Sequence, residues 1–81
     1  MKDKLKLLSK KAKALKIGEY EHYKGNKYLV LCVGRHSETL EEMVIYQAQY
    51  KDKSIWTRPL EMFMGKVEVD GKKVPRFKFM K

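Results

Sequence analysis

The chain is short of cysteine, of acidic side chains and of long apolar runs, and each shortage excludes a class of protein. Its 81 residues include one cysteine, Cys32, so no disulfide can form within the chain, which favours a reducing, cytosolic setting. No apolar run approaches the roughly 18 residues that a membrane-spanning helix needs. Residues 1–17 contain lysines without a continuous apolar stretch, so they lack the pattern of a secretory signal.

Motifs that indicate a metal site or a serine-type enzyme are also missing. The sequence has neither a Cys-x-x-Cys nor a His-x-x-x-His spacing for zinc, and it has no Gly-x-Ser-x-Gly turn that would expose a nucleophilic serine. We interpret His22 and His36 as hydrogen-bonded structural side chains. We therefore expect no metal, no cofactor and no catalytic residue.

The shortage of acidic side chains leaves a net charge of +9, from 19 basic and 10 acidic residues. Residues 1–17 contribute seven lysines and one aspartate, or +6, whereas residues 18–81 contribute twelve basic and nine acidic side chains, or +3. Most of the positive excess therefore lies in the N-terminal segment. The charge of the remainder is not by itself a nucleic-acid footprint.

The N-terminal segment has the pattern of a basic amphipathic helix, expected over residues 3–16 within a segment 1–17. Four apolar side chains fall on one face, at spacings of three and four: Leu5, Leu8, Ala12 and Leu15. Because a helix of this length is marginal alone, we expect this face to dock on the rest of the chain. The alternative is that the lysine face binds a membrane or a nucleic acid.

From Gly18 onward, where the helix would end, short β segments alternate with turns. The pattern puts Tyr20 on one side of a first strand, with its two glutamate neighbours on the other. Residues 27–33 predict a strand buried on both faces, with Cys32 as a small buried hydrophobe. Residues 43–50 and 55–57 predict two more strands. Most aromatic rings should fill the core between these strands.

Three connecting segments carry more specific patterns. Residues 35–42 predict a polar loop with one helical turn at residues 38–42, and residues 59–63 predict a 3₁₀ turn entered through proline. Residues 67–74 alternate around Asp-Gly, which predicts a hairpin. We therefore expect a mainly β fold, a small SH3-like barrel of about five strands over residues 18–81, preceded by the helix.

Five pieces of the chain also match a known family, in the right order: residues 20–25, 35–39, 44–46, 56–63 and 75–77. The Arg-His-Ser-Glu-Thr and Trp-x-Arg-Pro-x-x-Met-Phe pieces are specific in combination. On these pieces, the chain from Gly18 to Phe77 resembles the domain-of-unknown-function family 1653. The resemblance implies an SH3-type barrel and supplies no catalytic or cofactor residue. The lysine-rich residues 1–16 lie outside it.

The three arginines all fall in these matching pieces. Arg35, Arg58 and Arg76 are the only arginines among 19 basic residues, and a guanidinium presents a planar fork that suits a carboxylate or a phosphate. The simpler interpretation is internal pairing of Arg35 or Arg58 with Glu42 or Glu61. The alternative is a site that receives the phosphate or carboxylate of a ligand.

The polar loop could also be taken for a catalytic cluster. Neighbouring residues of an extended chain point apart, so His36 is poorly placed to activate Ser37. We interpret Ser37 as the N-cap of the helical turn, with Glu38 in the first turn, where the helix dipole favours acidic groups.

These observations predict a non-catalytic binding module whose surface joins the polar loop to the 56–63 turn. The candidate ligand-binding residues are Arg35, His36, Ser37, Glu38, Trp56, Arg58, Glu61 and Arg76. Three functions stay open. The module recognises an anionic ligand such as RNA or another nucleic acid, helped by the lysine helix; it binds a protein or peptide in an aromatic groove; or it is a small enzyme that uses His36 with Glu38 or Glu42.

Overall fold

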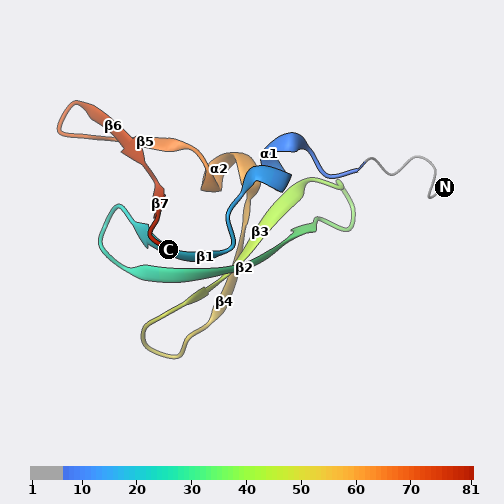
Figure 1. Cartoon of the computed structure of the whole chain (residues 1–81), viewed down its shortest axis with the longest axis horizontal. Helices are drawn as coiled ribbons and strands as arrows, with labels where there is room; N and C mark the ends of the chain where they lie inside the picture. The colour runs from blue at the N-terminus through green and yellow to red at the C-terminus, as the bar shows by residue number, and fades with distance from the viewer. Residues whose placement is uncertain (1–6) are drawn as a thin grey trace.

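The computed structural model describes residues 7–81. The chain is mainly β. Its elements, in order, are α1 (Lys10–Ala14), β1 (Gly18–His22), β2 (Lys27–Arg35), β3 (Glu42–Ala48), β4 (Ile55–Pro59), α2 (Leu60–Phe63), β5 (Lys66–Val69), β6 (Lys72–Pro75) and β7 (Phe77–Phe79). Figure 1 shows α1 and α2 together on one side of the larger sheet, with the β5–β6 hairpin extending away from it.

Two antiparallel sheets form, and they do not close into a barrel. Strands follow the order β4-β3-β2-β1-β7 in the larger sheet, while β5 and β6 pair only with each other. The predicted closed barrel is therefore wrong. A closed sheet would need strand pairing between β4 and β7, but the hairpin that lies between them in sequence forms a separate sheet. The larger sheet still curls, and its two edge strands approach each other: the Arg58 guanidinium carbon on β4 lies 5.7 Å from the ring centroid of Phe77 on β7.

A β-bulge in β2 changes which side chains reach the core. The register between β2 and β3 shifts between Val30 and Cys32, so that Leu31 is an extra residue. Val30 is fully buried, whereas both Leu31 and Cys32 are exposed. The expectation of a strand buried on both faces, with Cys32 inside, is therefore wrong.

The core lies between the curled sheet and the two helices. Its buried residues are Ala12, Leu15, Tyr20, Val30, Val44, Tyr46, Leu60, Phe63 and Phe77. Phe63 and Phe77 stack with ring centroids 4.1 Å apart and planes 8° apart, and Tyr20 and Tyr46 pack around Phe63. The prediction that most rings fill the core is confirmed for these side chains, while Trp56 stays 54% exposed.

Helix α1 is shorter than the predicted helix, whose first residues lie outside the described part. It begins at Lys10 because the Ser9 hydroxyl accepts the Ala12 N–H at 3.1 Å, and it ends where Leu15 becomes extended. Docking is confirmed for the described apolar residues, since Ala12 and Leu15 are buried and Leu8 is half-buried. The chain must be extended after Leu15 to enter β1, which shortens the helix.

The predicted turns form with one change of type. In α2 the Met64 N–H donates to the Leu60 carbonyl at 2.9 Å, which is the spacing of an α-helix rather than of a 3₁₀ turn. The hairpin is confirmed: Asp70 and Gly71 both have positive φ, as a type I′ turn requires.

Candidate ligand-binding surface

Strand register places two of the arginines at the same end of the larger sheet. Strand β3 runs between β2 and β4, with Arg35 opposite Glu42 and Arg58 opposite Val44. Residues opposite each other, or two apart on one strand, share a face. Arg35 on β2 and Arg58 on β4 therefore lie on the same face of the sheet, on opposite sides of β3. Their partners on β3, Glu42 and Val44, are two residues apart.

The three arginines have different surroundings, and Arg35 is the one beside a carboxylate. The Glu42 carboxylate accepts hydrogen bonds at 2.7 Å from both the hydroxyl and the backbone N–H of Ser9. These bonds, the hydroxyl first, hold the pKa of Glu42 below its ordinary value, and the charge of Arg35 adds to the effect. Arg35 therefore lies close enough to Glu42 for its charge to act on the carboxylate, and the pairing of the two side chains stays a prediction.

Arg58 does not pair with either glutamate that the sequence suggested. Its Nε donates to the Tyr46 hydroxyl at 3.2 Å, and its guanidinium lies over Phe77. Glu61 instead accepts from the Lys11 ammonium at 2.8 Å, in an exposed pair that contributes at most about 1 kcal/mol. Within residues 7–81, no carboxylate lies within ion-pair distance of Arg58. The predicted internal pairing of Arg58 is therefore wrong.

Arg76 lies on the bend between β6 and β7 and is half-buried. Its backbone is held on both sides, because its N–H donates to the Gly65 carbonyl and its carbonyl accepts the Tyr23 N–H, each at 3.0 Å. Its Nε is buried without a hydrogen-bond partner, and no carboxylate in the described chain pairs with it. The backbone of Arg76 is thus held in place, while one donor of its guanidinium stays unused inside the protein.

His22 lies beside these arginines, although the sequence analysis did not include it in the surface. It is the last residue of β1 and faces inward, with its ring centroid 4.9 Å from that of Phe77 and 4.6 Å from that of Tyr23. Its Nδ1 accepts the Lys24 N–H at 3.1 Å. In the neutral ring the proton is therefore on Nε2.

The pKa of His22 reflects both its burial and the positive charge around it. Burial of the ring is the main cause that lowers this pKa below 6.5, followed by the positive charges of Arg58, Arg76 and Lys24. The imidazole is therefore neutral at pH 7. Arg58 and Arg76 are 18 residues apart in sequence, but the Arg58 guanidinium lies over the Phe77 ring that packs on His22, and Arg76 directly precedes Phe77. The fold therefore brings the positive charges of these two arginines, the arginine cluster, near His22.

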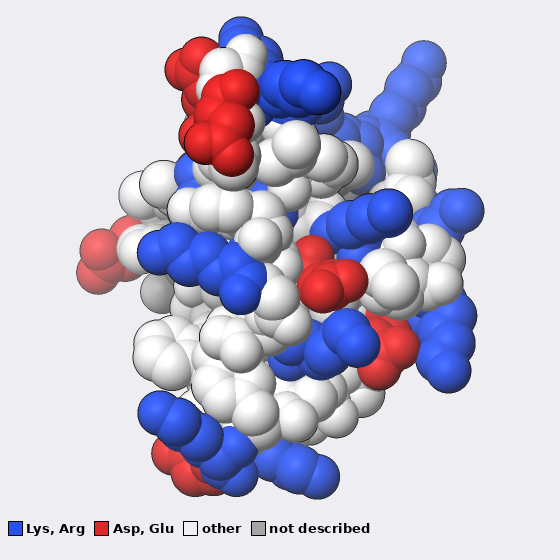
Figure 2. Space-filling model, turned by 90° about the vertical axis from the view of Figure 1, so that its left-hand side faces the viewer, with Lys and Arg blue, Asp and Glu red and all other residues white. Residues whose placement is uncertain are grey.

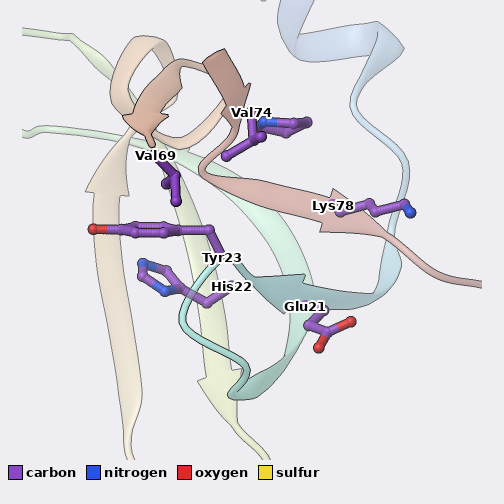
Figure 3. A pocket seen from close by; sticks show the side chains of 7 residues that line it. Glu21, His22, Tyr23, Val69, Val74 and Lys78 are labelled. Carbon is purple, nitrogen blue, oxygen red and sulfur yellow. The ribbon is translucent and has the colours of Figure 1, made fainter. Parts of the chain in front are cut away.

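A pocket of about 510 Å³ opens beside this cluster, between the β5–β6 hairpin and strands β1 and β7. Figure 3 shows its lining: His22 and Tyr23 lie one above the other, with hairpin residues beyond Tyr23 and two charged side chains at the other end. The labelled residues are Glu21, His22, Tyr23, Val69, Val74 and Lys78. No sequence pattern predicted this pocket, because it depends on where the hairpin lies relative to β1.

Trp56 adds an exposed aromatic side chain to the same surface. It lies on β4 opposite Tyr46, two residues before Arg58, so Trp56 and Arg58 share a face of the strand. The face in Figure 2 carries scattered lysine and arginine side chains, with acidic side chains among them and uncharged surface between. On β4, the exposed Trp56 ring and the positive charge of Arg58 therefore lie on one face.

Comparison with known proteins places the chain in a family. Residues 18–79 match the family described as protein of unknown function (DUF1653). The chain belongs to the DUF1653 family. Its fold is similar to the crystal structure of a DUF1653 protein from Bordetella bronchiseptica, at 32% identity and a TM-score of 0.79, over 85% of this chain and 91% of that one. No curated protein matches the chain.

The polar loop of this DUF1653 domain differs from the prediction. Residues 38–42 form no helix, because Glu42 already belongs to β3. The Nδ1 atom of His36, rather than Ser37, accepts backbone N–H groups, from Glu38 at 3.2 Å and Thr39 at 3.3 Å. The interpretation of Ser37 as an N-cap is wrong, and His36 supplies the acceptor.

The predicted surface residues thus separate into three groups. Trp56 and Arg58 lie on β4, and Arg76 directly precedes Phe77, over which the Arg58 guanidinium lies. Arg35 is the last residue of β2, and His36, Ser37 and Glu38 follow it in the exposed loop. Glu61 lies on α2 and pairs with Lys11 of α1. Across residues 7–81 of the DUF1653 domain, no three potential ligands gather to hold a metal ion, and no helix is long and apolar enough to cross a bilayer.

Proposed function

We propose that this DUF1653 domain is a non-catalytic module that binds an anionic ligand, and that the ligand is RNA or another nucleic acid. One observation carries the proposal: Arg58 lies over the Phe77 ring that packs on His22, Arg76 directly precedes Phe77, and neither arginine has a carboxylate partner in the described chain. A guanidinium that the protein does not neutralise is suited to receive a phosphate.

Exposed rings favour a nucleic acid over an isolated phosphate. Trp56 is 54% exposed and Tyr23 is 40% exposed, and both lie near the arginines. Aromatic faces next to arginine stack with bases in proteins that bind single strands, and such stacking tolerates many sequences. The net charge of +9 would also attract a polyanion at long range.

Helix α1 has a supporting role in this proposal. Its apolar face docks on the core, which leaves Lys10, Lys11 and Lys13 exposed. Lysines without a fixed geometry add nonspecific attraction to phosphates rather than recognition. Single lysines of α1 are therefore matched controls for the arginines, because their removal changes the charge by the same amount.

The test is a titration of short RNA and DNA into the protein at two salt concentrations, by fluorescence of Trp56 or by NMR. We expect Arg58→Gln and Arg76→Gln each to weaken binding about 10-fold, or roughly 1.4 kcal/mol, and to flatten the salt dependence. Lys13→Gln should have a smaller effect. Equal losses for all three variants would reduce the binding to nonspecific attraction, and affinity that does not fall with salt would contradict the proposal.

A second function is favoured by the edge of the larger sheet. Strand β4 is an edge strand, and it exposes Ile55 (62%) together with Trp56. An extended peptide could add to this edge and place apolar side chains on these two residues. Such binding would be saturable and largely insensitive to salt, so the same two salt concentrations distinguish the two functions.

Two finer assignments accompany the proposal. The exposed, free thiol of Cys32 supports a reducing, cytosolic compartment. The helical turn of α2 before the last strands supports an SH3-like relationship for the open sheet.

A further inference from the structure

The 510 Å³ pocket next to the arginine cluster has two walls that differ in chemistry. One wall is aromatic, formed by Tyr23 and His22 at the end of β1, and the other is aliphatic, formed by Val69, Val74 and Pro75 of the hairpin. Pockets of about 300–1,000 Å³ with mostly apolar walls are typical of sites for small molecules or parts of larger ligands. The volume is therefore sufficient for one planar ring system.

The walls leave apolar surface exposed that a ring would cover. Tyr23 is 40% exposed and Val69 is 38% exposed, although both are large apolar groups. In Figure 3 the Tyr23 ring lies between the His22 ring and the side chain of Val69, while Glu21 and Lys78 lie farther along the pocket. A ligand ring that enters here would meet aromatic and aliphatic surface, with polar groups at one end.

The pocket and the arginine cluster are directly connected. Arg76 follows Pro75 of the aliphatic wall, and its carbonyl accepts the N–H of Tyr23 from the aromatic wall at 3.0 Å. The ammonium of Lys24 lies 5.9 Å from the centroid of the Tyr23 ring, which adds positive charge at this end of β1. A base in the pocket would thus have positive charge beside it, where a phosphate of the same nucleotide, attached through its sugar, would lie.

We propose that this pocket receives a single unpaired base of the bound nucleic acid, while the adjoining phosphates lie at Arg58 and Arg76. The inference rests on the function proposed above and makes it more specific. A base that is stacked and paired in a duplex cannot enter a pocket between two walls without leaving its helix, which costs a few kcal/mol. The domain should therefore prefer single strands to duplexes of the same length.

The test follows the methyl signals of Val69 and Val74 by NMR during titration with a mixed-sequence RNA hexamer, the matched duplex, and inorganic phosphate. A base between the walls should shift both methyl signals through its ring current, and we expect this shift only when the single-stranded hexamer is added. The duplex and phosphate should shift only signals near Arg58 and Arg76.

Two variants complete the test. Tyr23→Leu keeps apolar bulk but removes the aromatic face, so we expect at least a tenfold loss of affinity for the hexamer and little change for the duplex. Val69→Asp places a negative charge on an exposed strand position and should also weaken the affinity for the hexamer. Ile55→Ala, on the exposed edge of β4, is the control and should leave the preference for the single strand unchanged.

The outcomes separate this inference from the proposed function. The base pocket would be overturned if single strand and duplex bound with equal affinity and the methyl signals of Val69 and Val74 did not move. If binding still required Arg58 in that case, the anion-binding function would stand. Absence of any change at His22, Arg58 and Arg76 with every nucleic acid would overturn the function itself.

Discussion

At the scale of single residues, Arg76 carries a buried polar atom that no contact within the fold satisfies. Its Nε is the one buried side-chain nitrogen or oxygen in residues 7–81 without a hydrogen-bond partner. A buried polar atom left unsatisfied costs about 1–3 kcal/mol. Because this nitrogen is buried, a ligand phosphate would bond the guanidinium through its other nitrogens.

Replacement of Arg76 by methionine should separate binding from stability. The Arg76→Met variant keeps much of the side-chain volume and removes the unsatisfied atom, so the free energy of unfolding should stay the same or rise by about 1 kcal/mol. Urea denaturation measures this change. A loss of more than about 2 kcal/mol would show that the guanidinium has a structural partner that stabilises the fold.

The neighbours of the arginines could not be predicted from the sequence. Composition singled out Arg35, Arg58 and Arg76, because arginine is rare here among many lysines. The partner of Arg58 could not be predicted, since Tyr46 reaches it only across the pairing of β3 and β4. His22 was overlooked because its pattern in β1 is that of an ordinary inward-facing side chain.

At the scale of elements, local patterns predicted the strands and the hairpin. They did not predict features that depend on contact with another part of the chain. The Asp70-Gly71 turn is determined by its own two residues, so it was predictable. The bulge at Leu31 depends on the register with β3, and no feature of β2 alone reveals it. Helix α1 begins where Ser9 is held by Glu42, a contact across 33 residues.

A pair of serine variants tests these helix assignments. Ser9→Ala removes the cap of α1 and the bond from the Ser9 hydroxyl to Glu42, while the backbone N–H of residue 9 can still donate to Glu42. It should cost about 1 kcal/mol in the free energy of unfolding, within a usual range of roughly 0.5–2 kcal/mol. Ser37→Ala, the matched control, should change the stability by less than about 0.5 kcal/mol, because Ser37 caps no helix. Urea denaturation of both variants is the measurement, and an equal loss for the two would contradict the structure.

At the scale of the whole molecule, the open sheet is what creates the candidate site. The two edge strands approach each other through Arg58 and Phe77 without pairing their backbones. The separate hairpin then forms one wall of the pocket beside His22 and Tyr23. The sequence predicted a mainly β chain because strand periodicity is local, but it predicted a closed barrel because the position of the hairpin depends on tertiary packing.

The pH dependence of the whole molecule follows from the same arrangement. The pKa of His22 is lower in the folded chain than its ordinary value of 6.5. The unfolded chain therefore takes up this proton more readily, so the stability that His22 contributes is present above pH 6.5 and is lost as the pH falls through the folded-state pKa. A bound anion offsets the charges of Arg58 and Arg76 and should raise this pKa.

The most direct test of the account is therefore an NMR titration of His22 against pH, with and without the RNA hexamer. We expect the pKa of His22 to lie below 6.5 in the free protein and to rise when RNA binds, and we expect the rise to be smaller in Arg58→Gln and Arg76→Gln. RNA that binds while the titration of His22 stays unchanged would contradict the claim that these two arginines form the anion site.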